Sequence, residues 1–155
     1  MPRWTAASRV ALAALALLGC ARPAGIVMRP QVFAAPFDED ATAIRAVVTA
    51  FVRGEARGDE SVDTLLAPGT DFVSTGVLVT RSPRLAGMPG PGTGAAPDLH
   101  TRVTGDIAWV IASYTWVGDN PATGERGVAT FVLQRQPAGW RIRHVHSSHV
   151  ERWER

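Results

Sequence analysis

The spacing of apolar residues changes once along this chain, from a helical period to a strand period. Between residues 44 and 52 the apolar positions follow the i, i+3, i+4, i+7, i+8 pattern of one helix face: Ile44, Val47, Val48, Phe51 and Val52. From Asp71 onward the period is two, which is typical of strands. Helices followed by a run of antiparallel strands predict an α+β fold with the helices on one face of the sheet.

The boundaries follow from capping and turn residues. The first helix begins at the acidic cluster 38–40, because carboxylates suit a helix N-terminus. A second, short helix is expected at about 61–66. Strands are expected at 71–74, 77–80, 127–136 and 140–150, with one bent strand or a strand pair within 99–118. Residues 81–97 are rich in glycine and proline and are expected to form a loop.

Residues 107–117 (Ile-Ala-Trp-Val-Ile-Ala-Ser-Tyr-Thr-Trp-Val) are apolar at both parities. A strand of this kind is usually covered on both of its faces. The predicted helices can cover one face only. A second copy of the chain is the simplest cover for the other face, so a homodimer is expected.

The first nineteen residues have the layout of an export signal. Arg3 and Arg9 precede an apolar run, 10–18, that is too short to span a bilayer. The sequence Leu-Leu-Gly-Cys at 17–20 resembles the lipobox of bacterial lipoproteins. The resemblance implies cleavage before Cys20, a diacylglycerol on its sulfur and an acylated amino terminus, which together anchor a protein stably.

Cys20 is the only cysteine of the chain, which suits an acylation site in an oxidising compartment. Residues 20–37 are expected to be a flexible tether and 38–155 the folded domain. We therefore expect an exported, membrane-anchored lipoprotein of the bacterial periplasm or cell surface. Ala21 after the cysteine favours the outer membrane without deciding between the two membranes.

The charge balance excludes one class of function. The formal net charge is +2, but Arg3 and Arg9 leave with the signal peptide, so that the remaining chain is close to neutral. A neutral chain offers no phosphate-tracking surface. Nucleic-acid binding is therefore not expected.

The order of these elements, with Gly-Asp-x-Ala-Trp-Val at 105–110 and Gly-Trp-Arg-Ile-x-His-x-His-Ser-Ser at 139–148, resembles the SnoaL-like branch of the nuclear transport factor 2-like superfamily. The resemblance covers about 38–149. It implies a strongly curved antiparallel sheet wrapped around helices as a cone (a cystatin-like roll), a pocket at the open end, and dimers through the outer face of the sheet. It does not imply one activity, because the same cone hosts isomerases, cyclases, dehydratases, hydrolases and binding modules.

One segment departs from the family pattern. Relatives usually carry a further helix near the pocket mouth, between the second and third strands. Here the stretch 81–97 occupies that place, and its glycines and prolines rule out a stable helix. We expect the mouth of the cone to be open or loosely gated.

The last strand carries the candidate functional residues. Strict alternation from Trp140 and Ile142 places His144 and His146 on the interior face, as bases or ligand donors. Rim histidines satisfied by the backbone are the alternative. His-x-His could also chelate a metal, but His149 lies on the other face by parity and His100 would have to supply a third ligand from a neighbouring strand, so no metal is expected.

Tyr114 is the only tyrosine and could donate to an oxyanion, although no partner carboxylate is evident. The expected pocket wall combines the aromatic residues with the last strand: Phe51, Phe72, Trp109, Tyr114, Trp116, Phe131, Ile142, His144 and His146. Two functions remain open. The first is a small-ligand-binding or scaffold domain without a cofactor, for a small apolar molecule or a peptide. The alternative is a SnoaL-like isomerase or cyclase type of enzyme that uses His144, His146 and Tyr114 as acid and base.

Overall fold

A computed structural model describes residues 38–154 of the chain. One helix and one 3-10 helix precede the strands, which confirms the expected α+β class. In chain order the elements are α1 (Asp38–Arg57), η1 (Glu60–Leu65), β1 (Leu66–Ser74), β2 (Val77–Leu78), β3 (Thr93–Thr104), β4 (Ile107–Val117), β5 (Thr123–Gln136) and β6 (Gly139–Glu154). The predicted signal peptide, Cys20 and the tether lie outside the described residues.

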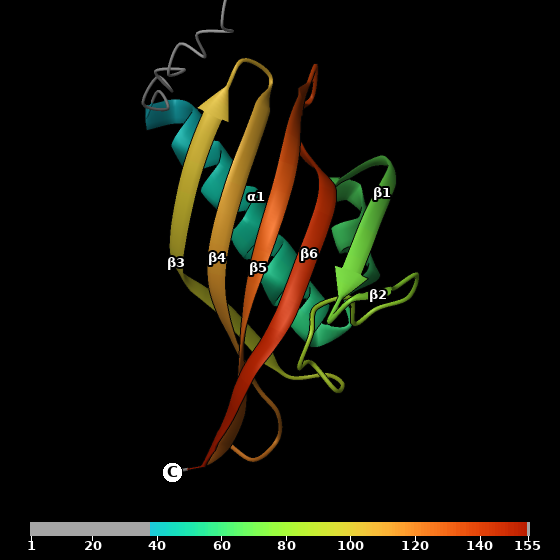
Figure 1. Cartoon of the computed structure of the whole chain (residues 1–155), viewed down its shortest axis with the longest axis vertical. Helices are drawn as coiled ribbons and strands as arrows, with labels where there is room; N and C mark the ends of the chain where they lie inside the picture. Colours follow the sequence, from blue (N-terminus) through green and yellow to red (C-terminus); the bar gives the residue numbers. More distant parts are fainter. Residues whose placement is uncertain (1–37, 155) are drawn as a thin grey trace, which may run out of the picture. The chain divides into compact units, whose positions relative to one another are not determined.

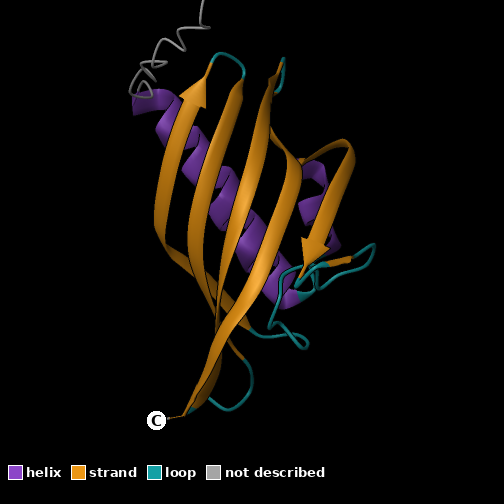
Figure 2. Ribbon diagram, in the orientation of Figure 1, coloured by secondary structure: helices purple, strands orange, loops and turns teal. Residues whose placement is uncertain are grey.

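The strands form one curved, unclosed sheet in the order β2-β1-β6-β5-β4-β3. Helix α1 runs along one face of this sheet, as Figures 1 and 2 show. Neighbouring strands are antiparallel except β1 and β6, which are parallel. This pair departs from the all-antiparallel expectation because the chain crosses to the far edge after β2 and returns strand by strand to β1. Within the described part of the chain, no helix is long and apolar enough to cross a membrane.

The apolar stripe of α1 is buried as its spacing predicts. Ile44, Val48 and Phe51 have no exposed surface and belong to one core with the inward side chains of the sheet. Gly54 lies inside the helix, where a side chain would collide with Val62 of η1. This glycine therefore permits η1 to pack closely on α1, and the helix continues through it to Arg57.

The Gly/Pro-rich loop between β2 and β3 contains no helix, as predicted, but it does not leave the cone open. Leu85, Ala86 and Met88 are only 2%, 5% and 4% exposed, and Leu85 and Met88 belong to the hydrophobic core. The loop turns these few apolar side chains inward, into the core. The expectation of an open or loosely gated mouth is wrong for this reason.

Candidate functional site

The terminal strand β6 changes its register in the middle. Ile142 pairs with Leu133 of β5, whereas His144 pairs with the adjacent Val132, so Arg143 is an extra residue in a β-bulge. Before the bulge the even-numbered residues face the core. From Val145 to His149 the odd-numbered residues do, and Val145 is fully buried. A second bulge at Val150 shifts the register again, because His149 pairs with Gly127 and Glu151 with the adjacent Arg126.

The bulge overturns the predicted interior position of two histidines. His144 is half-buried and His146 is exposed, both on the outer face of the sheet. Strand β1 is irregular at the same level, because Pro68 has no N–H for the ladder and Gly69 has a φ of 69°. The Arg143 guanidinium donates to the Pro68 carbonyl, which holds the extra residue in place.

Most of the other predicted pocket residues form solid core. Five of them are at most 5% exposed: Phe51, Phe72, Tyr114, Phe131 and Ile142. Phe51 packs against the Phe72 ring at 5.9 Å and against the Phe131 ring at 6.0 Å between centroids. Trp116 is half-buried, and its indole N–H donates to the Gly90 carbonyl at 3.0 Å. Trp109 is 44% exposed on the outer face, contrary to the prediction.

Tyr114 lies inside the cone, but its hydroxyl is already engaged. The hydroxyl donates to the Ala86 carbonyl at 2.6 Å, and the Ala86 N–H donates to Ser147 Oγ at 3.1 Å. Gly127 faces the ring, where a side chain would collide with it. Burial raises the pKa of Tyr114 to about 12, although a hydrogen bond with Ser147 opposes the rise. The hydrogen bond from Tyr114 therefore links the loop to strand β4.

A buried ion pair holds the same loop two residues earlier, at Arg84. Arg84 Nε and Nη2 lie 2.9 and 2.5 Å from Glu55 Oε1, and Nη2 lies 2.7 Å from Asp63 Oδ1. Glu55 is 1% exposed and Arg84 8%. Burial favours the neutral form of Arg84, but its hydrogen bonds to Glu55 and Asp63 outweigh burial and keep its pKa above the usual value.

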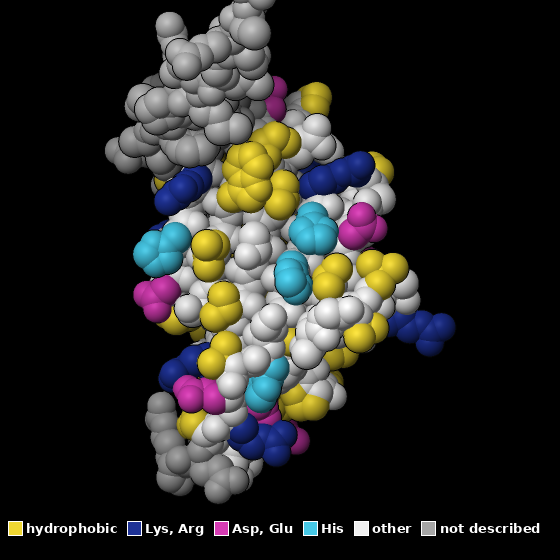
Figure 3. Space-filling model, in the orientation of Figure 1, with side chains coloured by type: hydrophobic (Ala, Val, Ile, Leu, Met, Phe, Trp, Pro, Cys, Tyr) yellow, Lys and Arg dark blue, Asp and Glu magenta, His cyan; other side chains and the backbone are white. Residues whose placement is uncertain are grey.

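The outer face of the sheet is open in the single chain and carries large apolar side chains. Trp109 and Ile111 of β4 are 44% and 52% exposed, and Val128 of β5 is 38% exposed. Figure 3 shows these hydrophobic patches interspersed with histidine side chains. We expected β4 to be covered on both faces. Within one chain only its inner face is covered, and its outer face is exposed.

The third metal ligand that His144 and His146 would need is far from them in the sheet. His100 pairs with Ile111 on β3, so β4 and β5 separate it from β6. Among residues 38–154, no group of three or more histidine, cysteine, aspartate or glutamate side chains could hold a metal ion.

A polar cluster of Glu125, His149 and Arg152 was not predicted, because the prediction assumed that the side chains of the last strand alternate strictly between its two faces. Past the bulge His149 turns to the inner side, and its Nε2 lies 2.7 Å from Glu125 Oε2. Arg152 Nε donates to Glu125 Oε1 at 2.6 Å. Burial favours protonated Glu125, but the hydrogen bonds from Arg152 and His149 outweigh it and lower the pKa of this carboxyl. A histidine held by a buried carboxylate is an arrangement that can move protons.

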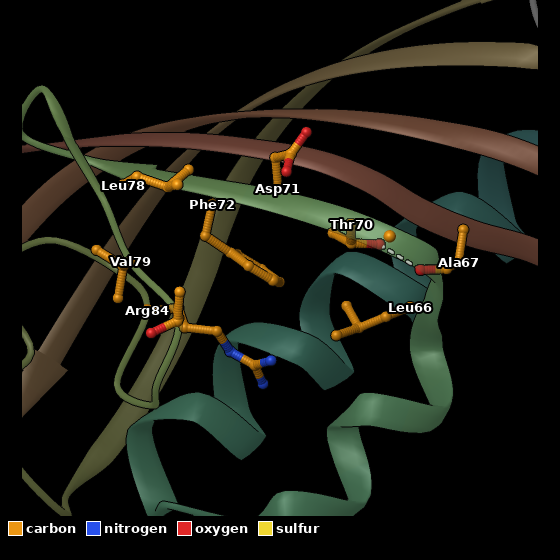
Figure 4. Close-up of a pocket in the computed structure, with 10 residues that line it drawn as sticks. Leu66, Ala67, Thr70, Asp71, Phe72, Leu78, Val79 and Arg84 are labelled. Atoms are coloured by element: carbon orange, nitrogen blue, oxygen red, sulfur yellow. Dashed lines mark hydrogen bonds between the residues drawn. The ribbon is translucent and has the colours of Figure 1, made fainter.

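An open pocket of about 340 Å³ lies beside β1, between β2 and η1 (Figure 4). Its wall is apolar at Leu66, Phe72 and Val79, and Arg84 borders it. Of the residues predicted to line a pocket, only Phe72 lines this one. This pocket lies at the edge of the sheet rather than inside the cone.

The fold and its buried inner face define the class, a cone-shaped domain of the nuclear transport factor 2-like type. The sequence model of the SnoaL-like domain matches residues 44–151. The chain belongs to the SnoaL-like family. A search of curated proteins finds no relative.

Solved structures agree with this assignment. A candidate dehydratase of the nuclear transport factor 2-like family from Streptomyces avermitilis is 26% identical, with a TM-score of 0.57, over 74% of this chain and 98% of that one. A candidate ketosteroid isomerase from Shewanella frigidimarina is 25% identical, with a TM-score of 0.53, over 68% and 94%. A protein with a cystatin-like fold from Novosphingobium aromaticivorans, at 17% identity and a TM-score of 0.58 over 73% and 83%, supports the fold alone.

Proposed function

We propose that this SnoaL-like domain is a non-catalytic binding and scaffold module. In this proposal the lipids on Cys20 tether it to a membrane of the bacterial envelope, and it pairs with a second copy through the outer face of the sheet. The observation that carries the proposal is the contrast between the two faces. The inner face is filled by the chain itself, whereas the outer face displays large apolar side chains.

The filled interior supports a binding role over chemistry inside the cone. Leu85 and Met88 occupy the space under the sheet, and the Tyr114 hydroxyl is bonded to the loop. A substrate would have to displace the loop and break the Arg84–Glu55 ion pair. Displacing the loop would leave Glu55, which is 1% exposed, without its partner, and an unpaired buried charge is costly.

The outer face supports pairing with a second copy. Trp109, Ile111 and Val128 lie on adjacent strands, and exposed apolar groups of this size usually mark an interaction surface. A two-fold axis lets the same patch cover itself. Burying the face would also complete the two-sided cover that the apolar sequence of β4 predicts.

Two experiments test the two parts of this proposal. Light scattering of a soluble chain beginning at Phe37 should report a dimer at micromolar concentration, and Ile111→Glu should convert it to monomer. Val77→Glu is the matched control, because Val77 is 64% exposed on another part of the surface. A parent chain that is monomeric refutes the pairing.

The tether is tested separately by cell fractionation. Cys20→Ala should release the protein from the membrane fraction or leave it unprocessed. Unchanged membrane attachment of a normally processed protein would refute the anchor.

A second candidate function is supported by the Glu125–His149 pair. A SnoaL-like enzyme of the isomerase type needs a positioned base, and His149 is 40% exposed beside a carboxylate that is 8% exposed. The relatives described as a candidate dehydratase and a candidate ketosteroid isomerase are consistent with acid–base chemistry. The base would then be His149 and not the two outer histidines of β6.

This alternative is tested by the isomerisation of a β,γ-unsaturated 3-ketosteroid, followed by the absorbance of the conjugated product. The enzyme hypothesis expects turnover that His149→Gln and Glu125→Gln abolish and that His146→Gln leaves unchanged. Absence of turnover above the buffer rate, or equal rates in all variants, would count against it.

A further inference from the structure

The pocket beside β1 is separate from the cone interior and from the outer face. Its wall combines apolar side chains with two threonines and two charged residues: Leu66, Ala67, Gly69, Thr70, Asp71, Phe72, Leu78, Val79, Thr80 and Arg84. Its volume of about 340 Å³ falls at the lower end of the range for small-molecule sites. The pocket is therefore large enough for a compact molecule of one ring.

Arg84 is the polar group best placed to orient such a molecule. Its side chain is 9% exposed, and its guanidinium lies over the Phe72 ring at 4.6 Å, as the close-up in Figure 4 illustrates. Two acids hold Nε and Nη2, which fixes the group rigidly. A rigid donor inside a mostly apolar wall is typical of a specificity element.

One nitrogen of this guanidinium remains available. Nη1 of Arg84 makes no hydrogen bond with any described residue. No buried side-chain nitrogen or oxygen in residues 38–154 lacks a partner, so Nη1 is reached by solvent. Since Arg84 borders the pocket, a bound molecule can accept a hydrogen bond from Nη1 without disturbing the ion pair.

The surrounding charge decides which acceptor fits. The two carboxylates of Glu55 and Asp63 already outnumber the one positive charge of Arg84. A ligand carboxylate or phosphate would meet this excess of negative charge. A neutral carbonyl oxygen would accept a hydrogen bond from Arg84 without that repulsion.

We propose that the pocket beside β1 binds a neutral, mainly apolar molecule through a carbonyl group that accepts a hydrogen bond from Arg84. This inference rests on the proposed binding role and names its ligand class. It predicts a small cyclic ketone as the simplest probe. The ring contacts Leu66, Phe72 and Val79, and the oxygen points to the guanidinium.

The test is a methyl NMR titration of the full chain in lipid nanodiscs with cyclohexanone. Saturable shifts are expected at the methyl groups of Leu66, Leu78 and Val79, with a dissociation constant on the order of 1–10 mM for so small a probe. The methyl groups of Val150, which is 54% exposed and belongs neither to the pocket nor to the proposed pairing surface, report unspecific partitioning and should not shift. No saturable shift at the pocket, or equal shifts at Val150, overturns the site.

Two matched probes test the role of Arg84 without mutating its ion pair. Methylenecyclohexane has the same shape but no oxygen and should bind about tenfold more weakly, as expected for losing one hydrogen bond to a charged group. Cyclohexanecarboxylate should also bind more weakly because of its charge. Equal binding of all three probes overturns the carbonyl assignment.

A variant locates the binding site. Thr80→Trp places a large ring at the exposed rim of the pocket and should abolish the cyclohexanone shifts, while the rest of the spectrum keeps its pattern. Shifts that persist in this variant contradict the assignment. Self-association is tested separately with Ile111→Glu, on the other face of the sheet. A negative result for ligand binding in the pocket can therefore be distinguished from a negative result for dimer formation.

Discussion

Over residues 108–112 the two faces of strand β4 reverse the usual relation between side-chain size and burial. On the inner face Ala108, Val110 and Ala112 are small or medium in size and have no exposed surface. On the outer face Trp109 and Ile111 are large and about half exposed. Helix α1 and the loop fill the inner side so closely that small side chains suffice there. The outer side chains keep apolar surface that only a partner can bury.

Deleting Arg143 should have the largest effect, because it removes the residue that separates the two registers of β6. A slip of one residue exchanges the faces of every following side chain. Val145 would turn to solvent and His144 into the core, so we expect no cooperative thermal unfolding by circular dichroism. Arg143→Ala keeps the extra residue and should fold; a deletion variant that melts like the parent would contradict the bulge.

A matched pair of isoleucines measures the difference between the faces directly. Ile142 is fully buried, and Ile142→Ala should lower the free energy of unfolding by about 2–5 kcal/mol. Ile111 is 52% exposed, and Ile111→Ala should cost less than about 1 kcal/mol in the monomer. Urea unfolding gives both values, and similar losses for the two variants would refute the assignment of the faces.

Tyr114→Phe removes the hydroxyl that fastens the loop. We expect a loss of about 1–2 kcal/mol, because the Ala86 carbonyl is left buried without this donor. The amides around Ala86 should exchange with deuterium faster than in the parent, while those of α1 should change little. Unchanged protection of the loop would show that the hydroxyl does not hold it.

The Glu125 cluster should make stability depend on pH. Its carboxyl has a pKa below the ordinary 4.5 in the folded chain, so its contribution is fully present above that pH and is lost as the pH falls through the folded pKa. Glu125→Gln should therefore cost about 1 kcal/mol at pH 7. The melting difference from the parent should shrink toward zero in strong acid; a constant difference at all pH values would disprove the linkage.

The smallest effect is expected at the outer histidines. His144→Ala and His146→Ala should each change the free energy of unfolding of the monomer by less than about 0.5 kcal/mol. The two side chains make no contact that the core requires, since one is half-buried and the other exposed. A loss of 2 kcal/mol or more would place them inside the domain.

The sequence predicted the elements well because their signals are local. The spacing of Ile44, Val48 and Phe51 is a property of one helix, and the loop after β2 is marked by its own glycines and prolines. Two boundaries were wrong: β3 begins at Thr93, inside the predicted loop 81–97, and β5 begins at Thr123 instead of 127. The sequence did not reveal how that loop is packed. Its buried residues, Leu85 and Met88, are few and follow no regular period.

The candidate site was mislocated because a bulge is set by a neighbouring strand. Nothing in residues 140–150 marks Arg143 as extra, and the Pro68 carbonyl that binds its guanidinium belongs to β1, which is distant in sequence and adjacent in the sheet. Residues 144–149 were therefore assigned to the wrong face, up to the second bulge at Val150. The same error hid His149, whose partner Glu125 becomes visible only when the strands are paired.

The register of β6 is tested most directly by cysteine accessibility. His146→Cys and Ser147→Cys are made separately in a chain that also carries Cys20→Ser and, to prevent shielding by a second copy, Ile111→Glu. With a maleimide in excess, Cys at 146 should react at nearly the rate of an unfolded chain, and Cys at 147 should react at least about a hundredfold more slowly, as expected for a residue released only by unfolding or large local opening. The opposite order, with position 147 reactive and position 146 protected, would contradict the account.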